Sequence, residues 1–285
     1  MGWNKDIEVS TEAPKDISDF FKKSEDYDIT DSIVYADALK CMIWGDAKLG
    51  KTHFALSFPE PVFVIDTEFG ATPLLRKFPG KEIYIMSTAV LDPDTDEPDM
   101  DESMKKLEEG ISTLRNLEKG TIVIDSGTDI WSWLGAWVEQ EAVKANKMTS
   151  AGTVQRLQWG RANLRWAHMI LRLMNKKGMH FVITAQPKEL YDNKGVQTGI
   201  FDAKIQGQTK FKCDIVLRVV KEYDDEEEKT IYVTTPTDCR FQRDWEPHIR
   251  DITFEKLATA MHKDLGVVVP DSLEAKALEI ATDAE

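Results

Sequence analysis

Short apolar runs alternate along this chain with longer stretches in which apolar residues recur at helical spacing. The runs are rich in Val and Ile and predict buried strands over residues 40–44, 61–65, 82–86, 121–124, 180–184, 215–220 and 230–234. The stretches between them predict helices over residues 51–57, 103–117, 131–145 and 155–177, with a closing helix over residues 253–265. Buried strands that alternate with helices form βαβ units. We therefore expect an α/β fold with a mostly parallel central sheet of about seven to nine strands and helices on both faces.

The two ends of the chain differ from this alternating middle. Residues 1–34 are polar and acidic, and residues 1–39 hold ten Asp and Glu against four Lys and Arg. This composition predicts a flexible arm or partner-binding tail, because too few apolar residues are present to form a core. We expect the core to span residues 35–250, followed by a C-terminal helix and tail over residues 251–285.

The charge of the chain is unevenly distributed. A net charge of −14 and a pI near 4.9 argue against a protein that coats nucleic acid with its whole surface. Residues 144–218, however, hold fourteen Lys and Arg against four Asp and Glu, a local balance of +10. This segment is either a solvated basic face or a track for a polyanion, and the sequence leaves both interpretations open.

The apolar runs and the cysteines exclude several classes of protein. No run approaches the roughly 18 apolar residues needed to span a bilayer, and the N-terminus has no basic-then-apolar signal. We expect a protein of the cytoplasm, or of the host cytoplasm if the chain is viral, with no membrane partner. Cys41, Cys213 and Cys239 lie far apart without CxxC spacing, which favours core thiols over a metal site or a disulfide.

The strongest chemical signal is the segment 45–52. It fits the pattern G-x-x-x-x-G-K-[ST] and lies between a predicted strand and a predicted helix. Its glycines let the backbone curl so that N–H groups point at phosphate, at the positive end of the following helix. Lys51 would reach the β- and γ-phosphates, and the Thr52 hydroxyl would bind Mg²⁺. The predicted ATP-binding residues are Gly45, Asp46, Ala47, Lys48, Leu49, Gly50, Lys51, Thr52 and His53.

Two strand-end carboxylates complete the candidate catalytic set. Asp125 follows the apolar run 121–124, as expected of a Walker B aspartate that orients Mg²⁺, although many strands end in an aspartate that only starts a turn. Glu68 ends an Asp-x-Glu motif after the strand that follows the phosphate loop. A base that activates water must lie near the γ-phosphate, and Ser126 occupies the position after Asp125 where that glutamate usually stands. Glu68 is therefore the predicted base, with a solvated strand-end acid as the alternative.

The order of these segments resembles the core of the RecA and RadA recombinases. The phosphate loop is followed by V-F-V-I-D-T-E, which ends at Glu68, by T-I-V-I-D-S, which contains Asp125, and by F-V-I-T-A-Q, which ends at Gln186. The resemblance covers residues 36–245, and it implies a RecA-like P-loop NTPase core. It also implies that Glu68 is the catalytic base and that Gln186 senses the γ-phosphate.

The same resemblance extends to the segment after Gln186. RecA proteins carry a mobile DNA-contacting loop at this place, and residues 187–209 are polar and contain glycine. Residues 210–218 resemble the strand that resumes after that loop. The short form of the chain is most similar to phage RecA-like single-strand annealing ATPases. The polymerisation helix and separate C-terminal domain of RecA are not recognisable, so the resemblance does not extend to filament formation.

Two further groups of residues have less specific signals. Residues 144–177 combine basic side chains with Trp159 and Trp166, a mixture suited to single-stranded nucleic acid. The same spacing fits a helix packing face, and we favour a core position for Trp166 and leave Trp159 open. Arg240 or Arg243 follows a late strand and would either complete the ATP site of a neighbouring subunit or be a plain surface arginine.

These features predict an ATP-dependent recombination or annealing ATPase that binds single-stranded DNA and requires Mg²⁺. The expected partners are single-stranded DNA on the basic region 144–218 and the loop 187–209, further copies of the chain, and a single-strand-binding protein or other replication partner. The alternative is a P-loop motor or loader that acts on a protein partner in replication or packaging, which the −14 charge and the acidic arm favour. A third class is a nucleotide-dependent switch with negligible turnover.

Overall fold

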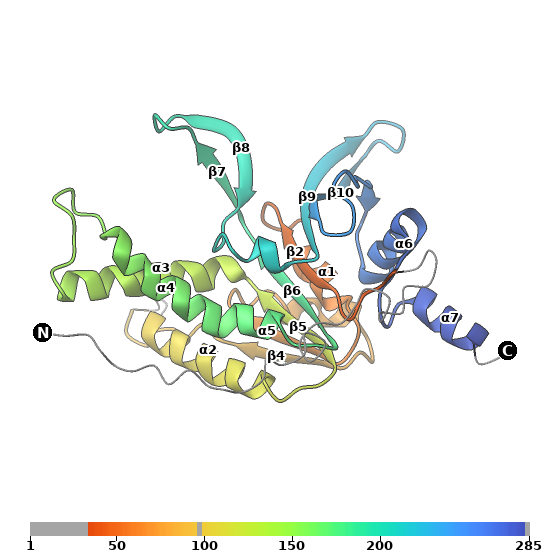
Figure 1. The fold of residues 1–285 in the computed structure, drawn as a ribbon, viewed down its shortest axis with the longest axis horizontal. Helices are drawn as coiled ribbons and strands as arrows, with labels where there is room; N and C mark the ends of the chain where they lie inside the picture. Colours follow the sequence, from red (N-terminus) through yellow and green to blue (C-terminus); the bar gives the residue numbers. More distant parts are fainter. Residues whose placement is uncertain (1–33, 96–98, 283–285) are drawn as a thin grey trace, which may run out of the picture. The chain divides into compact units, whose positions relative to one another are not determined.

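The central element of the structure is an eight-stranded sheet. The computed structural model describes residues 34–95 and 99–282, so the arm predicted over residues 1–34 lies outside the described residues except for Val34. Within the described residues the strand order is β11-β10-β9-β2-β6-β5-β3-β4 (Figure 1). The strands are β2 (Lys40–Trp44), β3 (Val62–Asp66), β4 (Ile83–Ser87), β5 (Gly120–Asp125), β6 (Met179–Ala185), β9 (Ile215–Asp224), β10 (Lys229–Cys239) and β11 (Ile249–Arg250).

Most of this sheet is parallel. The strands from β9 through β2, β6, β5 and β3 to β4 pair in parallel, whereas β10 pairs antiparallel with both β9 and β11. All seven predicted strands are present, although β9 and β10 extend beyond their predicted ends. The predicted α/β fold with a mostly parallel central sheet is confirmed.

Helices cover both faces of the sheet. Alternate side chains of a strand point to opposite faces, so Met42 belongs to the core cluster under α2, α3 and α4, while its neighbour Cys41 belongs to the cluster under α1 and α6. Both clusters are buried and apolar, which is the main stabilising contribution expected for such a layered fold. The helices are α1 (Lys51–Leu56), α2 (Met100–Leu114), α3 (Gly127–Lys144), α4 (Trp159–Trp166), α5 (Arg172–Met174), α6 (Phe254–Leu265) and α7 (Leu273–Thr282).

The helix predicted over residues 155–177 is present but interrupted. A 3-10 turn precedes α4, and a π-helical turn at Ala167–Leu171 separates α4 from α5. Trp166 is fully buried, and its indole Nε1 donates to Thr209 Oγ1 at 3.0 Å, so the predicted core position is confirmed. Trp159 is half-buried and packs against Trp131, with ring centroids 6.1 Å apart.

The segment 187–209 is not the loop that the sequence predicted. It forms an antiparallel hairpin of β7 (Pro187–Tyr191) and β8 (Gln197–Ala203), which projects away from the helices (Figure 1). Its turn is built by Asp192, whose Oδ1 accepts from the N–H groups of Lys194 and Val196, and by Gly195 at φ 78°. The polar composition concealed these strands, because a hairpin that packs against no core needs no apolar face.

The strand predicted over residues 215–220 starts where it was expected, but the first part of the segment 210–218, which resembles a resuming strand, is not extended. Lys210–Lys212 form a 3-10 turn, and β9 starts at Ile215. The side chain of Phe211 is 83% exposed on this turn. The correction matters because it places an aromatic ring in solvent, close in sequence to the end of the hairpin.

The C-terminal segment packs against the core. The helix predicted over residues 253–265 is present as α6, and Phe254, Leu257 and Met261 contribute to the cluster on the α1 face of the sheet. A short strand, β12 (Val267–Val268), pairs with β1 (Val34–Tyr35). Residues Tyr35–Glu285 group as one compact unit.

Candidate active site

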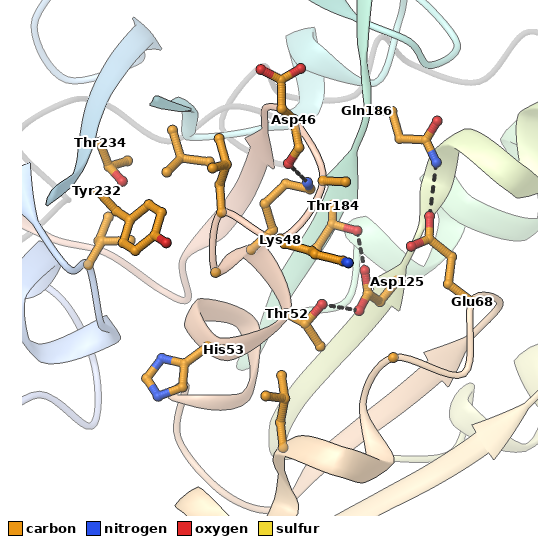
Figure 2. Close-up of a pocket in the computed structure, with 18 of the residues that line it drawn as sticks. Asp46, Lys48, Thr52, His53, Glu68, Asp125, Thr184, Gln186, Tyr232 and Thr234 are labelled. Carbon is orange, nitrogen blue, oxygen red and sulfur yellow. Dashed lines mark hydrogen bonds between the residues drawn. The ribbon is translucent and has the colours of Figure 1, made fainter. Parts of the chain in front are cut away.

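A cavity of about 1020 Å³ lies at the carboxyl ends of the parallel strands. The loops after β2, β3, β5 and β6 reach it, because the carboxyl ends of neighbouring parallel strands meet at one edge of a sheet. Its volume is at the upper end of the range found for small-molecule sites, about 300–1,000 Å³. Lys51, Thr52, Glu68, Asp125 and Gln186 all line it, so the structure brings together five of the predicted site residues. Figure 2 labels four of them, Thr52, Glu68, Asp125 and Gln186.

The phosphate loop between β2 and α1 forms one wall of this cavity. Gly50 has φ 87° and Gly45 has φ 152°, and a side chain at Gly45 would stand 2.4 Å from the Val219 carbonyl oxygen. Glycine is required at Gly45 because β9 lies this close behind the loop. Lys51 Nζ donates to the carbonyl oxygens of Gly45 at 2.9 Å and Asp46 at 2.6 Å, so its ammonium lies over the loop. Burial lowers the pKa of Lys51, while Asp125 and Glu68 act in the opposite direction.

Asp125 is the centre of a buried hydrogen-bonded group. Its Oδ2 accepts from Thr52 Oγ1 at 2.7 Å and its Oδ1 accepts from Thr184 Oγ1 at 2.5 Å (Figure 2). The carboxylate is 3% exposed, and burial raises its pKa, although the two threonine hydroxyls favour the charged form. The Thr52 hydroxyl and the Asp125 carboxylate are oxygen donors held side by side, which is the ligand chemistry that Mg²⁺ prefers.

These donors suit a metal ion that arrives with a nucleotide. Within residues 34–95 and 99–282 there is no cluster of three or more His, Cys, Asp or Glu that would hold a metal by itself. Magnesium is commonly bound by one or two protein oxygens together with phosphate oxygens. The pair Thr52 and Asp125 fits that arrangement.

Glu68 faces Gln186 across the cavity. Glu68 Oε1 accepts from Gln186 Nε2 at 3.0 Å (Figure 2). The same oxygen accepts from Ser126 Oγ at 3.0 Å. Glu68 belongs to the turn after β3, and Gln186 directly follows β6. The predicted base and the predicted sensor therefore share one hydrogen bond, so a group that displaces one of them also affects the other.

Two carboxyl groups, those of Asp66 and Asp129, support the turn that carries Glu68. Asp66 accepts from the N–H groups of Glu68 and Gly70 through Oδ1, and this fixes the turn. Asp129 Oδ2 accepts from Thr67 Oγ1 at 2.7 Å and from Ser126 Oγ at 3.1 Å, which places a second carboxyl beside Glu68. Burial raises the pKa of Asp129, and the neighbouring Glu68 raises it further. Asp129 lies in the first turn of α3, four residues after Asp125 at the end of β5.

The opposite end of the cavity is lined by a different set of residues. Tyr232 and Thr234 of β10 lie across the phosphate loop from Glu68 and Gln186, with His53 of α1 nearby (Figure 2). Asp251 and Ile252 also line this end. Burial lowers the pKa of His53, and so does Lys77. This end offers an aromatic ring and polar side chains to the part of a nucleotide that is distant from its terminal phosphate.

Several predicted residues lie outside the cavity. Arg240 is not among the cavity-lining residues, and its Nη1 is 2.5 Å from Asp214 Oδ1, so this side chain has a partner within the chain. Its role towards a neighbouring subunit stays a prediction. Of the basic residues expected to bind DNA, Arg165 pairs with Glu108 at 2.8 Å, and Arg161 lies over the Trp137 ring at 5.0 Å. These two arginines have structural contacts that the sequence did not reveal.

Comparison with known families agrees with the nucleotide site. Residues 37–244 match the AAA domain family, and this range covers more than two thirds of the chain. The chain belongs to the AAA domain family. Its matched range contains all five residues that meet in the cavity, so the phosphate loop described above is that of an AAA-family P-loop ATPase.

The AAA-family chain was also compared with curated proteins and with solved structures. No curated protein matches it. Among solved structures, it is similar to a KaiC-like protein from the hyperthermophilic archaeon Pyrococcus horikoshii OT3, with 14% sequence identity and a TM-score of 0.40. That similarity covers 74% of this chain and 84% of the other. In the part of the chain that the structure describes, no helix is long and apolar enough to cross a membrane.

Proposed function

We propose that the protein is a Mg²⁺-dependent ATPase that binds single-stranded DNA and acts in recombination or annealing. The observation that carries this proposal is that the cavity and the hairpin share one continuous chain segment. Thr184 near the end of β6 and Gln186 directly after it line the cavity, and the chain then leads directly into the β7–β8 hairpin. Hydrolysis in the cavity and contacts on the hairpin are therefore made by adjacent parts of one chain segment.

The chemistry of hydrolysis follows from the geometry of the cavity. The Lys51 ammonium and the loop N–H groups hold the phosphates, and Thr52 and Asp125 provide the oxygen donors for Mg²⁺. A water molecule attacks the γ-phosphorus, its proton passes to Glu68, and the bond to the β-phosphate oxygen of ADP breaks. The products are ADP and phosphate. Gln186 responds to the γ-phosphate because its carboxamide contacts Glu68.

The hairpin and the turn after it have the composition of a single-strand binding surface. Tyr191, Phe201 and Phe211 are exposed aromatic side chains on which bases can stack. Lys188 and Lys194 lie on the same hairpin and supply positive charge for the phosphates. The proposed surface uses the second half of the interface predicted over residues 144–218, because the exposed aromatic side chains lie there; both halves contain paired basic residues.

A protein partner is the second candidate, and one observation favours it. Val196 and Ile200 are exposed on the hairpin together with the aromatic residues, and contiguous exposed apolar side chains often mark a protein interface. In this case the chain is a motor or loader that acts on a protein in replication or packaging. Such a protein shows ATP hydrolysis that is indifferent to DNA.

The discriminating experiment measures ATP hydrolysis with and without single-stranded DNA at low and moderate salt. We expect DNA to stimulate hydrolysis and the stimulation to fade as salt increases, because phosphate contacts release counterions. Hydrolysis that does not respond to DNA at any salt contradicts the DNA proposal and favours the protein partner.

A variant of Glu68 distinguishes an ATPase from a nucleotide-dependent switch with negligible turnover. Glu68→Gln retains the size of the side chain but cannot accept the proton of water, and general-base catalysis contributes about 10²–10⁴-fold. We expect nucleotide binding to be retained and hydrolysis to fall within that range. Glu139→Gln, on the exposed side of α3, is the matched control. Unchanged hydrolysis in Glu68→Gln shows that Glu68 is not the base.

A further inference from the structure

The root of the β7–β8 hairpin is closed by one buried threonine. Thr128 lies in the first turn of α3 and is 1% exposed. Its Oγ1 accepts from the N–H of Gln186 at 2.9 Å and donates to the carbonyl oxygen of Lys204 at 2.7 Å. Gln186 directly precedes β7, and Lys204 directly follows β8. A single hydroxyl therefore binds both ends of the hairpin.

The two ends also bind each other. The N–H of Lys204 donates to the carbonyl oxygen of Gln186 at 2.7 Å. The three hydrogen bonds join Thr128, Gln186 and Lys204 in a closed ring. A hydroxyl is suited to this position because it can donate and accept at once. The hydrogen bonds to Gln186 and Lys204 hold the hydroxyl in one orientation.

The start of α3 and the hairpin root are in close contact. A side chain at Gly127 would stand 2.6 Å from Ile183 Cδ1 and 2.8 Å from Ile205 Cδ1, so only glycine fits without rearrangement. The segment after the hairpin is held as well, because Gln206 Nε2 donates to Asn163 Oδ1 of α4 at 3.0 Å. The root of the hairpin is therefore fixed to two helices, whereas its far end extends into solvent.

The same ring is connected to the cavity. The backbone of Gln186 belongs to the ring, and its side chain contacts Glu68 at 3.0 Å. Thr128 is three residues after Asp125 in the sequence. A movement of Gln186 that follows a change at the γ-phosphate must therefore either move the hairpin or break the bonds to Thr128.

We propose that Thr128 is a positioning residue that couples the nucleotide site to the hairpin. It holds Gln186 and Lys204 as one unit, so a change in the contact between Gln186 and Glu68 turns the hairpin instead of being absorbed by a loose root. The inference rests on the proposed function only in that Gln186 responds to the γ-phosphate. It does not depend on which partner the hairpin binds.

The test is hydrogen exchange of the hairpin amides without any nucleic acid. Exchange is measured for the wild-type protein in two states, one with ADP and Mg²⁺ and the other with a non-hydrolysable ATP analogue and Mg²⁺. We expect slow exchange at the Gln186 amide and a nucleotide-dependent change in exchange over residues 187–203. In Thr128→Val, which retains the shape but removes the hydroxyl, we expect the Gln186 amide to exchange at least about tenfold faster and the nucleotide-dependent change to disappear. Nucleotide affinity is expected to be unchanged.

Thr128→Ser is the matched control, because it retains the hydroxyl and loses only the methyl group. We expect it to restore the nucleotide-dependent change. The proposal is overturned if Thr128→Val responds to nucleotide as the wild type does, or if Thr128→Ser behaves like Thr128→Val, since the methyl group is then what matters. Fast exchange at the Gln186 amide of the wild-type protein also overturns it, and this measurement needs no variant.

The result for DNA is a separate outcome. If hydrolysis does not respond to single-stranded DNA but Thr128→Val still abolishes the hairpin response, the proposed function is wrong and the coupling stands. If DNA stimulates hydrolysis equally in the wild type and in Thr128→Val, the proposed function stands and the coupling through Thr128 is wrong.

Discussion

Strand β6 and the hairpin that follows it are consecutive in sequence but have opposite environments. Every residue of β6 is buried, and its carboxyl end delivers Thr184 and Gln186 to the cavity. Most of β8 is exposed, including Ile200, and Tyr191 at the end of β7 is 61% exposed. The two regions are separated by one residue, Gln186.

The contrast shows which apolar residues are explained by their contribution to folding and which are not. Burial of the apolar side chains of β6 stabilises the core, so the hydrophobic effect alone explains their identity. Apart from Ala203 at its root, the hairpin has exposed apolar side chains such as Val196 and Ile200, which stabilise no core and are typical of a surface that binds a partner. Under the proposed function, catalysis belongs to the buried region and partner binding to the hairpin, and the following variants test that division.

The largest expected effect is on the catalytic side. Lys51→Ala removes the ammonium that faces the phosphates, and loss of one such electrostatic contact costs about 10²–10³-fold in kcat. We expect ATP hydrolysis to fall by this amount, while the thermal midpoint changes little because both hydrogen bonds that Lys51 donates are to carbonyl oxygens of its own phosphate loop. Steady-state hydrolysis and thermal melting measure the two quantities. Lys105→Ala, on the exposed side of α2, is the control. Hydrolysis that survives in Lys51→Ala places the catalytic site elsewhere.

The next effect belongs to the hairpin side. Tyr191→Ala and Phe211→Ala each remove an exposed ring, and a stacked base contributes roughly 1–3 kcal/mol, or roughly 5- to 150-fold in affinity. We expect each variant to weaken binding of single-stranded DNA within this range and to leave hydrolysis without DNA unchanged. Fluorescence anisotropy with a labelled oligonucleotide measures the affinity.

Tyr223 provides a control for both hairpin variants. It lies on β9 and is 63% exposed, which is close to the value for Tyr191, but it belongs to a different hairpin. Tyr223→Ala is expected to bind DNA as the wild type does. An equal loss of DNA affinity in Tyr223→Ala would mean that any exposed aromatic ring contributes to DNA binding. The β7–β8 hairpin would then not be the specific DNA-binding surface.

A smaller effect is expected at the far end of the cavity. Tyr232 lines the cavity opposite Glu68 and is suited to stack on the nucleobase. Aromatic pairs contribute about 0.5–1.5 kcal/mol beyond area burial, so Tyr232→Ala is expected to raise KM for ATP roughly 2- to 10-fold with kcat unchanged. Tyr232→Phe should retain the wild-type KM. A lower kcat in Tyr232→Ala with KM unchanged would place this ring near the γ-phosphate, contrary to the account.

The smallest effect concerns a charge beside the core. Lys81 Nζ donates to the carbonyl oxygen of Leu56 at 2.7 Å, and burial lowers the pKa of Lys81 to about 8. A free lysine has a pKa of about 10.4, so the unfolded chain holds the proton more tightly and the free energy of unfolding rises as pH increases between these values. Solvent screens this half-exposed group, which limits the rise to less than about 1 kcal/mol.

Lys81→Met is expected to remove that rise. Chemical denaturation at several pH values from 7.5 to 10.5, roughly the interval set by the two pKa values, compares the variant with the wild type. The free energy of unfolding of the wild type should rise steadily relative to that of Lys81→Met as the pH increases across the interval. Parallel curves contradict the assigned pKa, and neither result affects the division between cavity and hairpin.

The sequence predicted the buried half of the molecule well for a physical reason. The strands that end at Asp66, Asp125 and Ala185 are short apolar runs, and such runs are distinctive because burial on both faces selects them. Once the strands are known to be parallel, their carboxyl ends must meet. The approach of Lys51, Glu68, Asp125 and Gln186 to one cavity was therefore predictable, although their catalytic roles are still predictions.

The features that the sequence did not reveal have weak local signals. The hairpin contributes no core face, so its strands lack the alternation that marks a half-buried strand. Thr128 and Asp129 are short polar residues at the start of a helix, where they are common for capping alone. Arg165 and Arg161 looked available for DNA because their partners Glu108 and Trp137 lie on other helices. Each of these depends on packing between distant segments.

The most direct test of the account is the affinity for single-stranded DNA in different nucleotide states. Glu68→Gln is incubated with Mg²⁺ and either ATP or ADP at moderate salt, and DNA binding is measured by anisotropy. Because coupling free energies between sites are typically about 1–3 kcal/mol, we expect affinities that differ at least about fivefold between the two states. Equal affinity in both states, or no binding at any salt, would contradict the claim that the cavity and the hairpin form one coupled device.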